Sequence, residues 1–362
     1  MKVLIVYAQA GAGHKKAAEA LDAYLKNAHP EISAKVIDIL DYTPKFFKLL
    51  YSDGYTFLIS RLAWLWYILY RLSFLFSKNP LFAYFDYITS QPFIRRLQKE
   101  KYEIVLSTHF LANNVISVYK KKHPESPLRL ISIITDYNLH PIWIGEGVDV
   151  YIVSCDYVEN ELIRRGIRAD KIKDYGIPAH PKFYSTLERK EAALRLGANP
   201  AQFTVLIMTG TFGIGPIEEI VKSLAGNLQL LVICGRNRQL YNRLCALRLN
   251  LVKVYSLIDN VDELMSVSDV VLTKAGGLTI TESLAKGVPM VFFSNIPGLE
   301  TANAEVIAKY GAGFTTENIE DIKSVIFALR DNRVFYENAL RSIKKISSAN
   351  TLEEISHILL DF

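Results

Sequence analysis

The sequence predicts an α/β protein of two Rossmann-like domains, each built on a parallel sheet. Short runs of Val, Ile and Leu alternate with amphipathic stretches, and this scheme starts again at FTVLIM, about 200 residues after KVLIVYA. Continuous apolar runs are typical of strands buried on both faces, and strands alternating with helices indicate right-handed parallel crossovers. Ligands of such sheets bind at the carboxyl ends of the strands, so we expect the two sheets to face a central cleft.

The first half opens with a strand over residues 2–8, a glycine turn and a helix over about 15–27. The second half opens with a strand over 203–208, again followed by a glycine-containing turn. The other strands are expected at 34–40, 103–108, 128–135, 148–154, 228–234, 252–258, 269–275, 288–293 and 312–316.

The domain boundary is expected near 178–185, where two prolines lie close together before a charged helical stretch. This gives an N-terminal domain over 1–180 and a C-terminal domain over 181–333. Residues 334–362 are expected to form a helix that returns toward the N-terminal domain.

Composition excludes several classes of protein. Half of the 362 residues are hydrophobic and the net charge is only +5, which excludes a disordered chain. Three cysteines, far apart and without a CxxC pair, argue against a disulfide scaffold or a zinc module and indicate a reduced, cytosolic protein. The apolar N-terminal run leads into glycines and charges, so we interpret it as a buried strand and not as a signal peptide.

Residues 45–101 differ from the rest of the chain. They hold nine Lys and Arg against three acidic residues, a net charge of +6, and 16 aromatic side chains. Because these charges alternate with aliphatic and aromatic residues, they do not form the polar stripe that binds nucleic acid. Any functional interpretation has to account for this segment.

Three loops of the first half hold residues that could carry chemistry. Gly11-Ala12-Gly13-His14 lies between a strand and a helix, where glycines admit a ligand and the helix N-terminus favours an anion. The motif is not a complete GxGxxG, because Lys16 occupies the third glycine position, and a simple tight turn is the alternative.

The strand ends at Ser107-Thr108-His109 and at Thr135 to His140 place further polar groups at the same edge. Asp136 and His140, four residues apart, could perform acid–base chemistry. The alternative is structural, because Asp is also common as a helix cap or in a turn.

The second half carries candidate binding loops after four of its strands. The most specific is Thr273 to Ser283, where backbone N–H groups at a helix N-terminus could hold a diphosphate and Glu282 could accept the hydroxyls of a ribose. The alternative is an ordinary helix start with a surface Glu. The other turns are Thr209 to Gly215, Cys234-Gly235-Arg236-Asn237 and Asn295 to Asn303, the last with polar groups for sugar hydroxyls.

These motifs, taken in order, resemble a known family. AGAGHKKAAEAL, STHFLANNV, ITDYNLHPIWI, CGRN, VDELMSVSDVVLTKAGGLTITESLAKGVPMVF and PGLETAN are similar to monogalactosyldiacylglycerol synthases and processive diacylglycerol glucosyltransferases, and more distantly to the glycosyltransferase that makes lipid II. The resemblance covers nearly the whole chain. It implies a GT-B fold and an inverting transfer of a hexose from a UDP-sugar to a lipid hydroxyl, without metal or cofactor. The absence of an Asp-x-Asp motif is consistent with this.

The resemblance also implies roles for individual residues. The UDP-sugar would be bound by residues of the second domain, the acceptor by residues of the first, and His14 or Asp136 would be the catalytic base. The family's usual GQE is Gly298-Leu299-Glu300 here, so one sugar-reading amide is missing and the donor sugar is left open. The donor-side residues are Gly210, Thr211, Phe212, Gly213, Arg236, Ile258, Gly276, Gly277, Leu278, Thr279, Glu282, Glu300 and Asn303; the acceptor-side residues are Gly13, His109 and His140.

If the acceptor is a lipid, segment 45–101 can be interpreted as a membrane-binding surface. Trp64, Trp66 and Tyr67 favour the membrane interface, and the neighbouring Arg61 and Arg71 attract anionic head groups. The longest uncharged stretch, nine residues over 62–70, is too short to span a bilayer, which takes about 20. We therefore expect a peripheral enzyme on the inner face of the cell membrane; a buried helical hairpin or an oligomer contact is the alternative.

The leading hypothesis is a lipid-acceptor hexosyltransferase acting on UDP-hexose and diacylglycerol. A UDP-sugar epimerase of the same architecture and a non-catalytic UDP-sugar-binding subunit are the alternatives. The aromatic and basic segment argues against the first, and the retained His14, Asp136 and Glu282 argue against the second. The choice of UDP-sugar, the lipid acceptor, processivity and the oligomeric state are left open.

Overall fold

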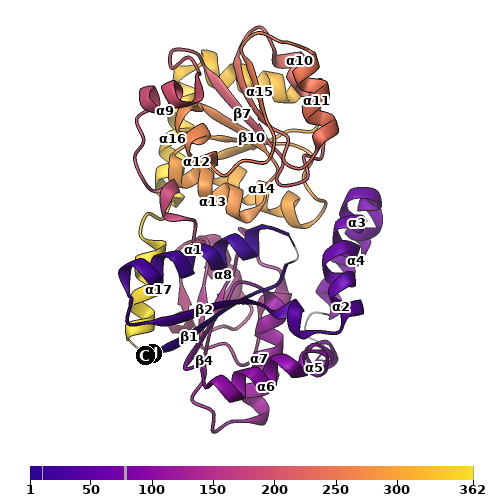
Figure 1. Cartoon of the computed structure of the whole chain (residues 1–362), viewed down its shortest axis with the longest axis vertical. Coiled ribbons are helices and arrows are strands. Elements are labelled where there is room, and N and C mark those ends of the chain that lie inside the picture. Colours follow the sequence, from indigo (N-terminus) through magenta and orange to yellow (C-terminus); the bar gives the residue numbers. More distant parts are fainter. Residues whose placement is uncertain (10, 77–79, 362) are drawn as a thin grey trace. The chain divides into compact units, whose positions relative to one another are not determined.

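A computed structural model describes residues 1–9, 11–76 and 80–361 (Figure 1). The side chains of residues 52, 53, 55, 56 and 60 are also outside the described part, so Asp53 and Lys78, which enter the charge count of segment 45–101, are not described. The chain divides into two compact units: unit 1 comprises 1–181, 297–299 and 348–362, and unit 2 comprises 182–296 and 300–347.

Unit 1 is built on a six-stranded parallel sheet with strand order β2-β1-β3-β4-β5-β6. Register is set by parallel pairs such as Val3 with Ile104 and Val3 with Ala34. The sixth strand has only two residues, too few for an apolar pattern, and was not expected from the sequence. The strands are β1 (Lys2–Tyr7), β2 (Ser33–Asp38), β3 (Ile104–Ser107), β4 (Arg129–Ile133), β5 (Val150–Ile152) and β6 (Ile172–Lys173).

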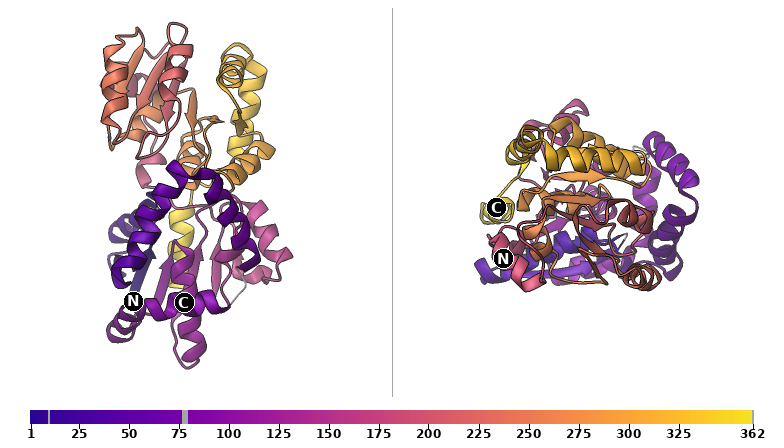
Figure 2. Two further views of the ribbon diagram at one scale, coloured as in Figure 1. Left: turned by 90° about the vertical axis from the view of Figure 1, so that its right-hand side faces the viewer. Right: turned by 90° about the horizontal axis from the view of Figure 1, so that it is seen from above.

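One face of this sheet is covered by two helices from opposite ends of the sequence. Leu21 and Leu25 of α1 (Gly13–Ala28) and Ile355 and Leu359 of α17 (Thr351–Leu360) share a buried cluster with the strands. In Figure 2 the yellow α17 runs among the indigo and magenta elements of unit 1. The expected single C-terminal helix is two helices, because α16 (Arg333–Ile346) belongs to unit 2 and the chain leaves helical conformation before α17.

Segment 45–101 is helical and lies between β2 and β3 in the sequence. Helices α5 and α7 pack together, and α4 has an apolar composition around nearly its whole circumference. Among the helices that the structure describes, none is long and apolar enough to cross a bilayer. The helices are α2 (Lys45–Leu49), α3 (Tyr55–Arg61), α4 (Ala63–Phe76), α5 (Pro80–Thr89) and α6 (Gln91–Glu100), with η1 (Ile39–Tyr42) before them, the π-helical turn η2 (Leu50–Gly54) among them, and α7 (Phe110–Lys122) after β3.

Three short elements connect the last strands of unit 1: η3 (Pro141–Trp143), α8 (Asp156–Arg164) and η4 (Ala169–Lys171). The first follows the loop after β4 that carries Asp136 and His140. A further short element, η5 (Pro181–Phe183), lies at the boundary between the two units.

Unit 2 repeats the scheme on a second six-stranded parallel sheet, with strand order β12-β11-β10-β7-β8-β9. Its core joins Val205, Ile207 and Leu230 of the sheet to Ile220 and Ile326 of covering helices. The predicted fold class, two α/β units with parallel sheets, is confirmed. The strands are β7 (Thr204–Met208), β8 (Gln229–Ile233), β9 (Val252–Tyr255), β10 (Val270–Thr273), β11 (Met290–Phe292) and β12 (Gly313–Thr315); the helices are α9 (Arg189–Leu196), α10 (Ile217–Leu224), α11 (Arg238–Ala246), α12 (Val261–Val267), α13 (Gly277–Lys286), α14 (Leu299–Tyr310), α15 (Ile319–Asp331) and α16.

Candidate active site

His14 lies at the start of α1, one residue after Gly13, at the carboxyl edge of the unit 1 sheet. Its Nδ1 is 2.8 Å from the carbonyl oxygen of Thr108 and 2.8 Å from Oγ1 of Thr135. A carbonyl only accepts, so Nδ1 carries the proton, and in the neutral ring Nε2 is then the basic nitrogen. Two neighbouring strand ends therefore fix both the orientation and the tautomer of this imidazole.

Burial lowers the pKa of His14 to about 4, and the hydrogen bond to Thr108 offsets this only in part. The ring is therefore neutral near pH 7. A neutral imidazole with a fixed Nδ1–H is the arrangement in which Nε2 can take a proton from a substrate hydroxyl.

His109 is buried and serves the local structure. Its Nδ1 accepts a hydrogen bond of 3.2 Å from the N–H of Leu111 and so caps α7. The ring packs edge-on against His14, with centroids 4.7 Å apart, and lies 4.2 Å from the ring of Phe110. Burial and the neighbouring His14 hold the pKa of His109 well below its usual range, so it packs as a neutral ring.

His140 has both ring nitrogens engaged. Nδ1 accepts from the N–H of Ile142 at 3.1 Å, and Nε2 is 2.9 Å from Oγ of Ser73 on α4. The Ser73 hydroxyl donates to the carbonyl of Tyr70 at 2.7 Å, so it accepts from Nε2–H of His140. In this arrangement His140 is not available as an acid–base partner of Asp136; it fastens α4 to the loop after β4.

Asp136 follows Thr135 directly and is buried, 8% exposed. Its carbonyl oxygen accepts from Oγ of Ser154 at 2.8 Å, which holds the loop after β4 against the end of β5. Burial, followed by the charge of Asp136, raises the pKa of Tyr70 to about 12. The Asp136 carboxylate therefore lies close enough to Tyr70 of α4 to affect its ionisation electrostatically.

In unit 2, the turn Gly210 to Gly215 packs tightly on the turn after β8. The backbone N–H of Arg236 donates to the carbonyl of Thr211 at 2.8 Å, and Nδ2 of Asn237 donates to the carbonyl of Gly213 at 3.1 Å. A Cβ on Gly213 would lie 2.3 Å from the carbonyl oxygen of Cys234, whereas one on Gly210 would meet nothing within 4 Å. Gly213 is therefore required by this backbone contact, while Gly210 faces open space.

The turn between β10 and α13 is held by side chains from the loop after β11 and from α14. Asn295 accepts from the N–H of Ala275 at 2.9 Å, and Asn303 donates to the Ala275 carbonyl at 3.1 Å. Glu300 Oε2 accepts from the N–H of Ile296 at 2.7 Å. Asn303, expected to meet the donor sugar, thus contacts the turn itself.

Glu300 and Lys274 form a buried pair beside the same turn. Lys274 Nζ lies 3.6 Å from Oε1 of Glu300, and both side chains are largely buried. Burial raises the pKa of Glu300, and the ammonium of Lys274 opposes this shift. A Cβ on Gly276 would find only Oε1 of Glu300, at 3.8 Å, so this side of the turn is open to a ligand.

Helix α13 begins at Gly277, and neither a side-chain cap nor an acidic residue occupies its first turn. Its N–H groups at Gly277, Leu278 and Thr279 are therefore oriented for an anion. Glu282 follows one turn later and is buried. Ile258 lies just after β9, half-buried, and the side chains of Arg236 and Phe212 are exposed.

Two family models match this chain. Monogalactosyldiacylglycerol (MGDG) synthase matches residues 14–179, and the glycosyltransferase family 28 C-terminal domain matches residues 204–356. The chain belongs to the monogalactosyldiacylglycerol synthase and processive diacylglycerol glucosyltransferase family. The resemblance in the sequence motifs is thereby confirmed.

Two similar proteins support this assignment, and a solved structure shares the fold. The chain is 31% identical to a processive diacylglycerol beta-glucosyltransferase of Bacillus subtilis, over 63% of this chain and 62% of that protein, less than two thirds of its length. It is 29% identical to monogalactosyldiacylglycerol synthase 1 of Arabidopsis thaliana, over 95% of this chain and 68% of that protein. The crystal structure of Acinetobacter baumannii MurG superposes with a TM-score of 0.64 at 14% identity, over 100% of this chain and 99% of that one, and so shares its fold.

Sequence reasoning about this family member missed three site residues. Thr135 and Asn295 lie within the quoted loops but were given no role, and Lys274 was seen only as part of the turn before Gly276. Their one signal was position, since each lies within three residues of the end of a strand. Their partners, His14 on α1, Ala275 after β10 and Glu300 on α14, belong to other elements and are brought to them only by the fold.

The aromatic residues of α4 divide between surface and interior. Trp64 is 65% exposed, and Tyr67, Arg61 and Arg71 are exposed as well, whereas Trp66 is half-buried with its ring 6.3 Å from that of Tyr70. Trp66 therefore packs inward.

Within the described part of the chain, no group of His, Cys, Asp or Glu side chains is arranged to hold a metal ion.

Proposed function

We propose that this protein transfers a hexose from a UDP-hexose to the hydroxyl of diacylglycerol, with inversion at the anomeric carbon. The observation that carries the proposal is the pair of hydrogen bonds at Nδ1 of His14, because they leave Nε2 as a neutral base at a strand end. The names of the relatives supply diacylglycerol as the acceptor and a hexose as the transferred group, and the resemblance of the sequence motifs implies UDP as its carrier.

The donor diphosphate would bind at the N-terminus of α13. Three features support this: an uncapped first turn, the open side of Gly276, and the ammonium of Lys274 beside the turn. Glu282, one turn further along, would accept the ribose hydroxyls. Positive charge and N–H groups at this place would stabilise the UDP leaving group without a metal ion.

In the reaction, the acceptor oxygen would form a bond to C1 of the hexose while the bond from C1 to the UDP oxygen breaks. Nε2 of His14 would take the acceptor proton, and UDP would leave with the electron pair. Asp136 is the alternative base; its place beside Thr135 also suits it to orient the acceptor or to stabilise the imidazolium.

Membrane attachment would use the exposed side chains of segment 45–101. Most of the exposed large apolar residues of the described chain lie there, including Phe46, Trp64, Leu75 and Leu81. Helix α4 has 14 residues, which suits a helix that lies in the interface and does not span it. We therefore propose a peripheral enzyme at a cytoplasmic membrane face.

A panel of UDP-glucose, UDP-galactose and UDP-N-acetylglucosamine, each incubated with diacylglycerol vesicles, tests the function. Mass analysis should show a hexosyl-diacylglycerol with one of the hexose donors, and repeated hexose increments would reveal processivity. Because Leu299 replaces a sugar-reading amide, the panel also identifies the donor. UDP-sugar epimers without a lipid product would support an epimerase, and UDP binding without turnover of any donor would support a binding subunit.

A further inference from the structure

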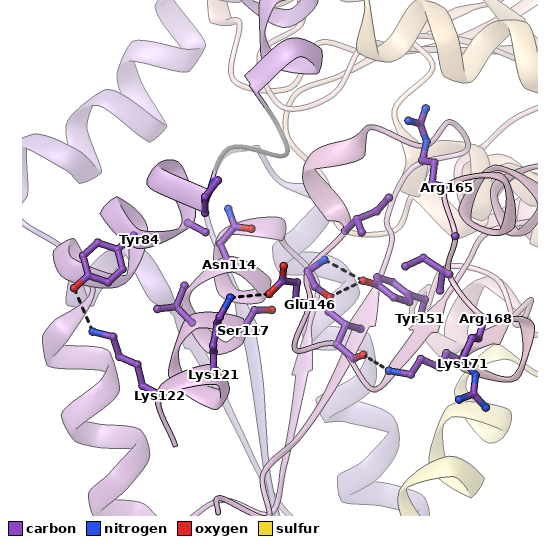
Figure 3. A pocket seen from close by; sticks show the side chains of 18 of the residues that line it. Tyr84, Asn114, Ser117, Lys121, Lys122, Glu146, Tyr151, Arg165, Arg168 and Lys171 are labelled. Atoms are coloured by element: carbon purple, nitrogen blue, oxygen red, sulfur yellow. Dashed lines mark hydrogen bonds and ion pairs between the residues drawn. The ribbon is translucent and has the colours of Figure 1, made fainter. Parts of the chain in front are cut away.

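A cavity of about 940 Å³ lies in unit 1, between α5, α7 and the loop from α8 to β6. Figure 3 shows the pair of Lys121 and Glu146, 3.3 Å apart, between Tyr84 and Tyr151. All of its lining residues belong to unit 1, and none is assigned above to the donor or the acceptor. The proposed donor site is elsewhere, at the strand ends of unit 2.

The sheet of unit 2 changes direction between β7 and β10, which are neighbours in its strand order. The chain leaves β7 toward α10 and β8 on one side, and it leaves β10 toward α13 and β11 on the other. The loops after these two strands therefore part from each other. Open α/β sheets bind their ligands in the crevice that forms at such a point.

Thr209 and Lys274 stand at this crevice. Met208 and Thr273, the last residues of β7 and β10, are paired in register, so the residues that follow them leave the sheet side by side. Gly210 then turns the chain with a φ of +73°, and a Cβ at this position would meet nothing within 4 Å. Open space for a ligand thus adjoins Thr209.

The hydroxyl of Thr209 is unusual for a buried group. Thr209 is 2% exposed, and in the part of the chain that the structure describes its Oγ1 is buried without a hydrogen-bond partner. Buried hydroxyls are normally paired, because an unpaired one loses its bonds to water without replacement.

Thr204, at the other end of β7, shows the normal arrangement. Its Oγ1 donates to the carbonyl of Gln202 at 3.0 Å and accepts from Nε2 of Gln229 at 2.8 Å. Two buried threonines of one strand therefore differ: the one at the amino end is satisfied within the protein, and the one at the carboxyl end is not. The place of Thr209 at the crevice indicates that its partner is a ligand.

The charges around the crevice favour an anion on the side of α13. Glu218 and Glu219 occupy the first turn of α10 and disfavour an anion there, whereas the first turn of α13 has no acidic residue. Lys274 adds an ammonium group next to Thr209. A threonine hydroxyl can donate to a phosphate oxygen, and such charge-assisted bonds are strong.

We propose that Thr209 is a further donor-binding residue, whose hydroxyl donates a hydrogen bond to an oxygen of the donor diphosphate. This inference rests on the proposed function, because the diphosphate at α13 supplies the acceptor atom. The hydroxyl destabilises the ligand-free protein and is satisfied only when the donor binds. Stability and donor affinity are therefore opposed at this one residue.

Thr209→Val tests this through two measurements, because valine has nearly the size of threonine and lacks the hydroxyl. Calorimetric titration of the full chain with UDP should show an affinity lower than wild type by roughly tenfold or more. The urea unfolding midpoint of the ligand-free variant should be at least as high as that of wild type, since no hydrogen bond within the protein is lost. Thr209→Ser keeps the hydroxyl and should bind UDP within about threefold of wild type.

Thr204→Val is the matched control, with the same substitution at the other end of the same strand. It should lower the unfolding midpoint, because Gln229 loses its acceptor, and it should leave the affinity for UDP unchanged. Uridine, which lacks the phosphates, is a second control. Its affinity, measured by displacement of UDP, should be the same in Thr209→Val and wild type.

Undiminished UDP binding by Thr209→Val, or an unfolding midpoint lowered as in Thr204→Val, would overturn the proposal. Equal weakening for uridine would place the hydroxyl at the nucleoside, and a loss confined to UDP-hexose would place it at the sugar; either would overturn the diphosphate assignment. If wild type itself does not bind UDP, the proposed donor site fails, and this contact fails with it. If wild type binds UDP and Thr209→Val binds it equally, only this inference fails.

Discussion

Ser73 Oγ on α4 and Nε2 of His140 lie 2.9 Å apart, in a chain of hydrogen bonds that runs from the N–H of Ile142 to the carbonyl of Tyr70. These hydrogen bonds join α4, an apolar surface helix, to the loop that carries Asp136. The ring centroid of Phe74 lies 4.2 Å from that of His140, so Phe74 packs against the same contact. Helix α4 is thus positioned by a polar contact as well as by packing.

Removing the Ser73 hydroxyl should loosen α4. In Ser73→Ala the Nε2–H of buried His140 loses its acceptor, which we expect to cost about 1–3 kcal/mol. The measurement is the urea unfolding midpoint together with hydrogen exchange of the α4 amides. Ser73→Thr keeps the hydroxyl and serves as control; equal exchange in the Ala variant and wild type would show that packing alone holds the helix.

Acid should destabilise the protein through its buried histidines. Burial, followed by the charge of Arg165, lowers the pKa of His140 to about 4, against 6.5 when exposed. Between these values the unfolded chain binds more protons, so stability falls as pH drops below about 6.5. The loss for such a histidine is about 2 kcal/mol at pH 5. Unfolding midpoints from pH 7.5 to 5 measure it, and a His140→Gln variant should show a smaller slope.

His14→Ala should lower kcat by roughly 10²- to 10⁴-fold while UDP still binds, because the variant loses the proposed base and keeps the proposed donor site in unit 2. With a pKa of about 4, His14 keeps its base form, so kcat/KM should not fall between pH 7 and 5 on its account. Thr135→Val, which deletes one Nδ1 partner, should lower kcat less. If His14→Ala keeps full activity, Asp136 becomes the candidate base, to be tested by Asp136→Asn.

Two glycines of one turn should respond differently to substitution. Gly213→Ala places a Cβ 2.3 Å from a carbonyl oxygen, at a φ of +55°, so the turn must shift, at a cost of about 3 kcal/mol or more. Gly210→Ala meets open space at a φ of +73° and should cost only about 1 kcal/mol. Denaturant unfolding compares the two, and equal losses would contradict the close contact with Cys234.

Exposed aromatic residues of α4 should bind membranes. Trp64→Ala/Tyr67→Ala removes two exposed rings, and we expect vesicle co-sedimentation to weaken by roughly tenfold or more. Leu194→Ala, an exposed apolar residue of unit 2, is the matched control. Undiminished binding by the double variant would assign the surface to another contact.

Much of the fold was predictable because its strands are continuous apolar runs. The expected strand at 203–208 is β7, and that at 128–135 contains β4. The two-residue β6 has no pattern to find, since two residues cannot show a period. The break between α16 and α17 was missed because the apolar spacing continues on both sides of it.

The sequence by itself determined the fold class and the family, and it predicted the loops of the candidate site, because these depend on patterns local in the chain. Only the tertiary structure decided the role of each residue within those loops. It joined His14 to Thr135, 121 residues away, and fixed its tautomer; it turned His140 toward Ser73, and Asn303 toward Ala275. The physical reason is that hydrogen bonds between strand ends depend on strand order, and strand order is set by the packing of the whole sheet.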